Sequence, residues 1–419
     1  MHTQHTGVHV MTFSTTIKTT YKPKRLAVKL TAKGENYVQD GHPWVFSESI
    51  VKINDHARTG DLAIIFGKRA NKMIGIGLYD ATSPIRIKMI YNATASVTID
   101  AAFFLKKIQK AYKKRLPLLK TKTNSYRLLF GENDGFPSLI ADVYTKVLVV
   151  KLYSEIWLPF LQSILESLVE VSGCKTVVIR LSRSLQNSKS HQLHDGDVVY
   201  GELKNDVVQF IEHGVQFSAN VIKGHKTGYF LDHRENRRQV GLLSKNKTVL
   251  DVFSYAGGFS VHALANGAKE VTSVDVSEQA LEIALQNGKL NAYSGTHKTL
   301  AGDAFQLLEE LASAKQRFDV VVIDPPSFAK QQSEVNLAKK KYAQLAQLGI
   351  QLTAKGGMLV LASCSSRVTA TAFYDINAQT LQATKRPFTI AQKTEHDIDH
   401  PIGFPEGAYL KCGYYRFLD

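Results

Sequence analysis

The chain has 419 residues, of which 44% are hydrophobic and 21% charged, values typical of a globular protein with a buried core. At roughly 100–200 residues per domain, two or three domains are expected. No stretch approaches the ~20 apolar residues of a membrane helix, and the N-terminus lacks the apolar run of a secretory signal, so we expect neither a membrane protein nor a secreted one.

The three cysteines are Cys174, Cys364 and Cys412, and they lie far apart in the sequence. This spacing fits neither a disulfide framework nor a CxxC metal site. We therefore expect a cytoplasmic protein in a reducing environment, without a bound metal.

Positive charge is concentrated at the N-terminal end. The chain has 52 basic and 37 acidic residues, a net charge of +15; residues 1–150 hold 23 basic and 10 acidic residues, and the rest holds 29 and 27. Such an excess attracts a polyanion in a salt-dependent way, which favours contact with nucleic acid. The alternative is a solvated basic surface.

The N-terminal part divides into three predicted segments. Residues 1–24 are polar and Thr-rich, and we expect a flexible leader. Residues 25–95 contain short β-prone runs separated by glycines, which predict a small β-barrel. These runs are RLAVKL, HPWVFS, DLAIIF, MIGIGLYD and PIRIKMIY.

An α+β linker domain is predicted over 96–218. Residues 99–117 have the apolar spacing of a helix that Pro117 ends, and its stripe is Ala102, Leu105, Ile108 and Tyr112. Five lysines lie between these positions: Lys106, Lys107, Lys110, Lys113 and Lys114. They could face phosphates or only solvent. Strands at VLVVKLY and TVVIRLS, a helix over 156–171 and a hairpin of VVYGEL and VQFIEHGVQFSA should follow.

Residues 219–419 are predicted to form a doubly wound α/β domain. The runs TVLDVF, EVTSVDV, FDVVVIDPP and GGMLVLASCS alternate with helical stretches at 259–266, 277–291 and 335–353. Apolar strands that alternate with helices are typical of a parallel sheet buried on both faces.

Ligands of such sheets bind at the carboxyl ends of the strands. In VLDVFSYAGGFS, Gly257 and Gly258 would let the backbone approach a ligand, Asp251 could meet a cationic amine, and Tyr255 lies in the same loop. The loop does not match the GxGxxG dinucleotide pattern.

Two further carboxylates follow in the expected order. Asp275 ends the next strand, where an acid can accept hydrogen bonds from ribose hydroxyls. Asp303 could meet an adenine amine or only cap a helix. The set predicts a nucleoside-bearing ligand.

The segment KTGYFLDHRENRR precedes the first strand of this domain. Lys226 and Arg234 in it are predicted to contact the ligand as part of a lid. A surface ion-pair cluster is the alternative.

The candidate catalytic residues lie at the ends of two predicted strands. The motif DPPSFAK places Asp324 and Pro325 at the end of one strand, and Cys364 ends the next strand. A thiolate that adds to carbon 6 of a pyrimidine makes carbon 5 nucleophilic, which is covalent catalysis. The alternative is a buried cysteine that acts as a small hydrophobe, and we expect that for Cys174 and Cys412.

Several motifs together resemble the bacterial 23S ribosomal RNA large-subunit (cytosine-C5) methyltransferase I family, over nearly the whole chain. They are KTGYFLDHRENRR, LDVFSYAGGFSVHAL, DPPSFAK, SCSS and DHPIGFPEGAYLK, and GHPWVFSESI is similar to the start of that family's RNA-binding PUA domain.

The resemblance implies S-adenosylmethionine as methyl donor and 23S ribosomal RNA as substrate, before or during large-subunit assembly. It also implies Cys364 as nucleophile, with Asp324 in the catalytic site. Glu406 is a candidate for the base that removes the carbon-5 proton, or it is only a surface turn residue. The chain could form a homodimer. Two alternatives stay open: methylation of uridine carbon 5 or of a guanine nitrogen, and a non-catalytic RNA-binding assembly factor.

Overall fold

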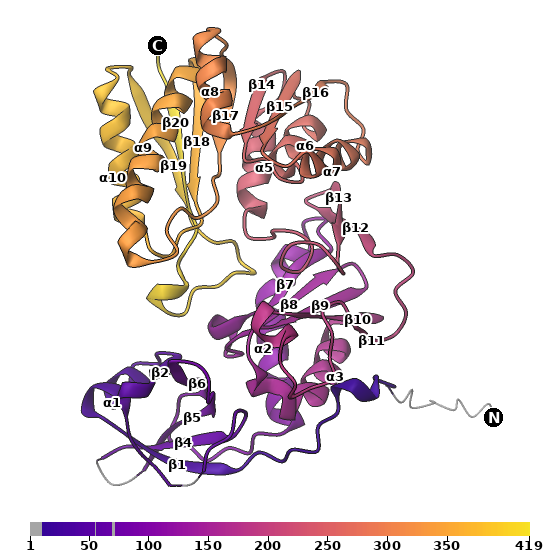
Figure 1. Ribbon diagram of the computed structural model, residues 1–419. Helices are drawn as coiled ribbons and strands as arrows, with labels where there is room; N and C mark the ends of the chain where they lie inside the picture. The colour runs from indigo at the N-terminus through magenta and orange to yellow at the C-terminus, as the bar shows by residue number, and fades with distance from the viewer. Residues whose placement is uncertain (1–10, 55, 69–71) are drawn as a thin grey trace, which may run out of the picture. The chain divides into compact units, whose positions relative to one another are not determined.

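The computed structural model describes residues 11–54, 56–68 and 72–419, and the chain forms two compact units (Figure 1). Unit 1 holds the chain up to Lys120 together with Asn124–Phe210 and Ala219–Phe230. Unit 2 holds Thr121–Thr123, Ile211–Ser218 and Leu231–Asp419. None of the described helices is long and apolar enough to cross a membrane.

The first sheet of unit 1 has six strands in the order β2-β6-β5-β4-β1-β3. β1 and β4 are parallel and the other neighbours antiparallel. The five predicted strands are confirmed; α1 and β3 were not predicted. The bounds are β1 Arg25–Leu30, α1 Ala32–Gln39, β2 Trp44–Phe46, β3 Ile50–Ile53, β4 Leu62–Phe66, β5 Met73–Tyr79 and β6 Ile85–Tyr91.

Strand β4 connects the first sheet to the rest of unit 1, because its two faces pack into different cores. Ala63 and Ile65 join a core of the sheet's own strands, whereas Leu62 and Ile64 join the large core built by the following helices and strands. A strand buried on both faces reads as a continuous apolar run, as LAIIF does.

The second sheet of unit 1 has the order β11-β10-β9-β8-β7, with only β9 and β10 parallel. The predicted helix over 156–171 is partly wrong: α3 begins at Leu161, after a 3-10 turn over Glu155–Phe160 that contains Pro159. The bounds are α2 Ala101–Leu119, β7 Ser125–Phe130, β8 Leu139–Tyr144, β9 Val147–Leu152, α3 Leu161–Ser172, β10 Thr176–Leu181, α4 Arg183–Gln186 and β11 Val198–Tyr200.

Helix α2 differs from its prediction in two details. It passes through Pro117 and ends two residues later at Leu119, so the proline lies in the last turn and does not itself end the helix. Its buried face is Phe104, Ile108, Ala111, Arg115 and Leu118, and Arg115 joins it through a buried ion pair with Asp134. Of the predicted stripe, Ile108 is buried and Tyr112 packs against the core, whereas Ala102 is exposed. Lys106, Lys110, Lys113 and Lys114 are exposed, whereas Lys107 donates to the carbonyl of Ile90.

Part of the predicted leader lies in the fold. Residues 1–10 are outside the described residues. Phe13 and Ile17 are buried, and Phe13 stacks on Tyr200 with ring centroids 4.7 Å apart. These contacts anchor residues 13–17 to unit 1.

Unit 2 contains a seven-stranded sheet in the order β16-β15-β14-β17-β18-β20-β19. Its first five strands are parallel, and β20 is antiparallel to both of its neighbours. The predicted doubly wound sheet is confirmed. The bounds are α5 Arg234–Leu243, β14 Thr248–Val252, α6 Gly258–Ala265, β15 Glu270–Asp275, α7 Glu278–Lys289, β16 Thr296–Ala301, α8 Ala304–Ser313, β17 Phe318–Ile323, α9 Val335–Leu352, β18 Thr353–Ser363, α10 Ala370–Ala383, β19 Phe388–Thr394 and β20 Lys411–Phe417.

Alternate side chains of the central strands enter different cores. Val249 of β14 and Val320 of β17 pack with α5 and α6, whereas Leu250 and Val321 pack with α8, α9 and α10. The predicted hairpin of VVYGEL and VQFIEHGVQFSA is partly wrong, because Val198–Tyr200 forms β11 and pairs with β10. The hairpin is β12 (Val207–Glu212) and β13 (Val215–Asn220), and it contributes residues to both units.

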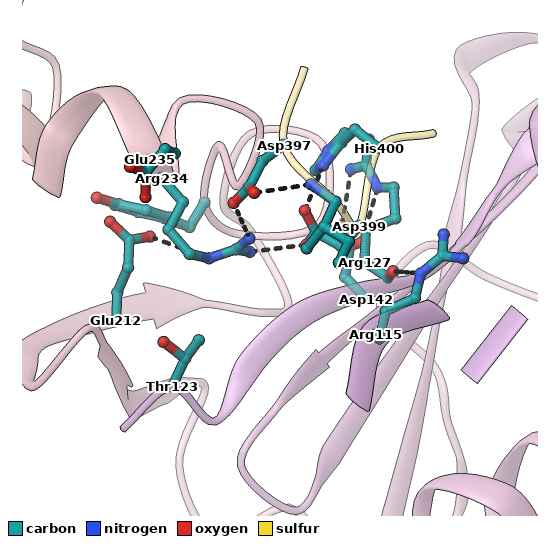
Figure 2. A network of polar contacts seen from close by, with 12 residues as sticks. Arg115, Thr123, Arg127, Asp142, Glu212, Arg234, Glu235, Asp397, Asp399 and His400 are labelled. Carbon is teal, nitrogen blue, oxygen red and sulfur yellow. Dashed lines mark hydrogen bonds and ion pairs between the residues drawn. The ribbon is translucent and has the colours of Figure 1, made fainter. Parts of the chain in front are cut away.

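Buried charges hold the start of α5 against the C-terminal segment of unit 2. Arg234 is fully buried, and its two terminal nitrogens donate to Asp397 at 2.9 Å and Asp399 at 2.8 Å (Figure 2). Arg237 forms a bidentate pair with Glu212, which also meets His262. Burial alone would raise the pKa of Asp399, but Arg234 and His400 hold it well below its ordinary value.

Arg234→Leu should therefore destabilise the protein by about 3–5 kcal/mol at pH 7, because Asp399 would stay buried without its cation. The depressed pKa of Asp399 keeps this contribution above its unfolded pKa of about 4 and loses it only at lower pH. The deficit should be smaller at pH 4 because the buried Asp399 of the variant, without its cation, takes up a proton there. Urea unfolding at pH 7 and pH 4 measures both effects.

The matched control is Arg238→Leu on the same helix, whose pair with Glu235 is 38% and 34% exposed. It should cost less than about 1 kcal/mol. Equal losses in the two variants would contradict the assigned role of the buried pair.

Candidate active site

The site lies where parallel strands of unit 2 end side by side. β14 pairs with β15 on one side and β17 on the other, and β17 pairs with β18. In this register Val252 lies opposite Ile323, and Ile323 lies opposite Leu361. The residues that follow these strand ends are therefore brought together, as expected for a doubly wound sheet.

The loop between β14 and α6 has an unusual backbone. Phe253, Tyr255 and Gly257 have φ values of 64°, 48° and 77°. A Cβ on Gly257 would lie 2.7 Å from the Cβ of Ala284, so this position requires glycine. Left-handed residues concentrated in one loop are typical of ligand sites, and α6 begins directly after this turn.

Asp251 is buried beside this turn. Its Oδ2 accepts hydrogen bonds from the backbone N–H and the hydroxyl of Ser260, whereas its Oδ1 has no hydrogen-bond partner in the described part of the chain. Burial raises the pKa of Asp251 to about 7, against the lowering effect of Ser260. An unpaired buried carboxylate oxygen is suited to the ammonium group of a ligand.

The next two predicted carboxylates have different surroundings. Asp275 ends β15 and accepts from the N–H of Tyr255 at 2.8 Å and of Ser277 at 3.0 Å, so it also braces the glycine turn. Asp303 accepts from the N–H of Gln306 and caps α8, which is the helix-cap alternative. It is exposed.

Cys364 meets a carboxylate and an imidazole. Its Sγ lies 3.8 Å from Oδ1 of Asp324, which follows β17, and 3.4 Å from Nε2 of His233, which precedes α5. His233 Nε2 and Asp324 Oδ1 are 3.3 Å apart. Burial lowers the pKa of His233, but the carboxylate of Asp324 outweighs burial and the net pKa is raised.

Exposure distinguishes Cys364 from the other two cysteines. It is partly exposed, whereas Cys174 and Cys412 are buried. Burial raises the pKa of both buried thiols. Of the three, only Cys364 combines access with polar partners, which is what a nucleophilic thiol needs.

A buried lysine holds the loop after Cys364. Lys411 of β20 donates from Nζ to the carbonyls of Ser365 and Val368, the latter at 2.7 Å. Burial lowers the pKa of Lys411 to about 8, and the nearby Cys364 raises it in part. Neither Lys411 nor His233 was singled out from the sequence.

The remaining predicted site residues have different surroundings. Pro325 is buried next to Asp324, whereas Lys226 belongs to unit 1. Both terminal nitrogens of Arg234 donate hydrogen bonds to Asp397 and Asp399, so we assign Arg234 a structural role rather than contact with the ligand. Glu406 lies exposed in the 3-10 turn Pro405–Gly407, and its role as a base stays a prediction.

Comparisons with known proteins agree with this geometry. Residues 126–388 match the model of an S-adenosylmethionine-dependent methyltransferase, and residues 28–92 match a PUA-like domain. A solved structure described as a SAM-dependent methyltransferase from Streptococcus mutans has a TM-score of 0.78 at 20% identity, covers 93% of this chain and 99% of its own, and supports the fold. The protein is thus an S-adenosylmethionine-dependent methyltransferase with a PUA-like domain.

Two curated relatives narrow the family. The chain is 39% identical to "Ribosomal RNA large subunit methyltransferase" of Deinococcus radiodurans, over 93% of this chain and 96% of that protein. It is 35% identical to "Ribosomal RNA large subunit methyltransferase I" of Escherichia coli, over 92% and 98%. The chain belongs to this family of ribosomal RNA large subunit methyltransferases.

Asp251→Asn should separate ligand binding from stability. Because the folded pKa of Asp251 is raised, the native state holds a proton that the unfolded state releases, and stability falls as pH rises from about 4 to 7. An asparagine does not ionise, so the variant should not lose stability in this pH range. Without the donor it should be more stable than wild type by about 1–3 kcal/mol at pH 8, and the two proteins should have similar stability at pH 4. Thermal unfolding at the two pH values measures this.

The same variant should bind S-adenosylmethionine at least about tenfold more weakly by calorimetry, since a charge-assisted contact is lost. Asp319→Asn, at the amino end of β17, is the control and should leave binding unchanged. Undiminished binding in Asp251→Asn would show that this carboxylate does not hold the donor.

Proposed function

We propose that the protein transfers a methyl group from S-adenosylmethionine to carbon 5 of a cytosine in 23S ribosomal RNA, with Cys364 as the covalent nucleophile. The observation that carries the proposal is the position of an accessible thiol at the end of β18, beside Asp324 and two strands from the glycine turn. The names of the relatives support ribosomal RNA as substrate.

The residues around the turn fit the methyl donor. The free oxygen of Asp251 would hold its ammonium group, Asp275 its ribose hydroxyls and Asp303 its adenine amine, while Tyr255, Gly257 and Gly258 would line the approach. S-adenosylmethionine supplies an electrophilic methyl group when bound.

Cys364 and its neighbours would activate the base. Addition of Sγ to carbon 6 of the pyrimidine makes carbon 5 nucleophilic. After methylation a base removes the proton from carbon 5, and elimination returns the electron pair to sulfur. Because carbon 5 cannot be reached inside a stacked helix, the target base would be extruded into the site.

Unit 1 would hold the RNA. Four lysines on one helix, Lys106, Lys110, Lys113 and Lys114, expose their charges to solvent, as phosphate contact requires. We therefore assign RNA docking to the predicted PUA-like domain (25–95) and linker domain (96–218), and catalysis to 219–419. We also propose cytoplasmic action on the RNA before or during subunit assembly.

Replacing the nucleophile tests the covalent route. Cells that lack this gene should lose one 5-methylcytidine from 23S ribosomal RNA, and mass spectrometry of the nucleosides detects the loss. Wild type should restore it, whereas Cys364→Ala should not, because activity should fall by about 10³-fold or more without the thiol.

Cys412→Ala is the control, since this cysteine is buried in the same unit and should be dispensable. Full activity of Cys364→Ala would reject the covalent mechanism and favour methylation of a guanine nitrogen. Loss of a 5-methyluridine instead would change the base and keep the mechanism.

A further inference from the structure

Two groups act on the proton position of His233, the amide of Asn236 at Nδ1 and the carboxylate of Asp324 at Nε2. Asn236 Oδ1 accepts hydrogen bonds from the hydroxyls of Thr394 at 2.6 Å and Tyr414 at 3.0 Å. Its amide nitrogen therefore faces Nδ1 of His233, at 3.1 Å. An amide N–H donates, so Nδ1 accepts and the ring proton resides on Nε2.

A second proton on the imidazole does not change this result. It would go on Nδ1 and would require the Asn236 amide to turn over, which the two hydroxyls permit because they can accept as well as donate. The imidazolium then carries N–H groups on both nitrogens. In both of these states Nε2 is a donor directed at Cys364 and Asp324, because the carboxylate of Asp324, 3.3 Å away, can only accept.

His233 is also held rigidly. It is 3% exposed, its ring packs against Phe259 at 5.6 Å between centroids, and its carbonyl accepts the N–H of Arg237 in the first turn of α5. The ring has little freedom to turn its other edge toward the thiol. A fixed donor loses little entropy when a charge forms next to it.

We propose that His233 is a catalytic residue that donates a hydrogen bond from Nε2 to the Cys364 thiolate, while Asp324 accepts the thiol proton. In this step the S–H bond breaks, an O–H bond forms at Oδ1 of Asp324, and the electron pair on sulfur forms the bond to carbon 6. The π bond between carbons 5 and 6 breaks, and its electron pair forms the bond from carbon 5 to the methyl group. On elimination the pair of the bond between sulfur and carbon 6 returns to sulfur, which Nε2–H again stabilises as a leaving group. The proton on Asp324 returns to sulfur after elimination. This inference rests on the proposed function of Cys364.

Other titratable or charged groups lie around this pair. Lys411 of β20 faces Cys364, and Tyr342 of α9 lies near Cys364 and Asp324. Asp232, Arg237 and His396 act on His233. They are the same in every variant below, so a change in the thiol's pH response reports on position 233.

The test is alkylation of Cys364 by iodoacetamide in the full-length protein, measured from pH 5 to 10 with the label located by mass spectrometry. Cys174 and Cys412 are buried and should react slowly. In His233→Ala the reaction at pH 7 should slow about 10- to 100-fold, the effect of losing a hydrogen bond to a charged group, and its midpoint should move to higher pH.

His233→Gln distinguishes a donor from a base. Glutamine offers an N–H but cannot take up a proton at neutral pH, so alkylation and methyl transfer should stay within about fivefold of wild type. If His233→Gln is as slow as His233→Ala, His233 is a general base and the proposal is overturned. Wild-type rates in His233→Ala would overturn it as well.

The two proposals fail differently. Retained methyl transfer in Cys364→Ala would reject the covalent function, whereas the alkylation rates would still test the contact between His233 and the thiol. Loss of activity in Cys364→Ala with unaffected alkylation in His233→Ala would reject only the role of His233. Thermal unfolding of each variant confirms that it is folded.

Discussion

The parallel pairing of β14, β17 and β18 is the constraint on which the site depends. Because Val252, Ile323 and Leu361 lie in register, the glycine turn, Asp324 and Cys364 emerge at the same end of the sheet. A shift of one residue in either pairing would turn the following side chains to the opposite face. The cores on both faces, which take alternate side chains of these strands, fix that register.

Unit 2 combines two uses of buried charge. Asp397 and Asp399 are compensated by Arg234, and this compensation stabilises the fold (Figure 2). Among the described residues no buried cation pairs with Asp251, and burial raises its pKa to about 7. A carboxylate that destabilises the donor-free protein but can pair with a ligand cation is typical of a binding site, where stability is reduced for function.

Much of the fold and part of the site could be predicted from the sequence. The strands of the doubly wound sheet are continuous apolar runs, and the residues that follow them, such as Asp324 and Cys364, are located by counting to the strand end. Helix α2 was misread because Arg115, a charged residue, is buried with Asp134. His233 could not be found, because its importance depends on contacts with Cys364, 131 positions away, and with Thr394 through Asn236. Arg234 lies two residues after Asp232 in the same motif and was predicted to contact the ligand, because the sequence cannot show which way a side chain points.

The most direct test of the central claim, that the thiol at 364 attacks an extruded cytosine beside the methyl donor, is a trapping experiment. Fluorine at carbon 5 cannot be removed as a proton, so 23S ribosomal RNA transcribed with 5-fluorocytidine should halt the reaction after methyl transfer. The account predicts a methylated RNA adduct covalently attached to the peptide that contains Cys364, formed only with S-adenosylmethionine present. Methylation of unmodified RNA without any such adduct, or an adduct at another residue, would contradict it.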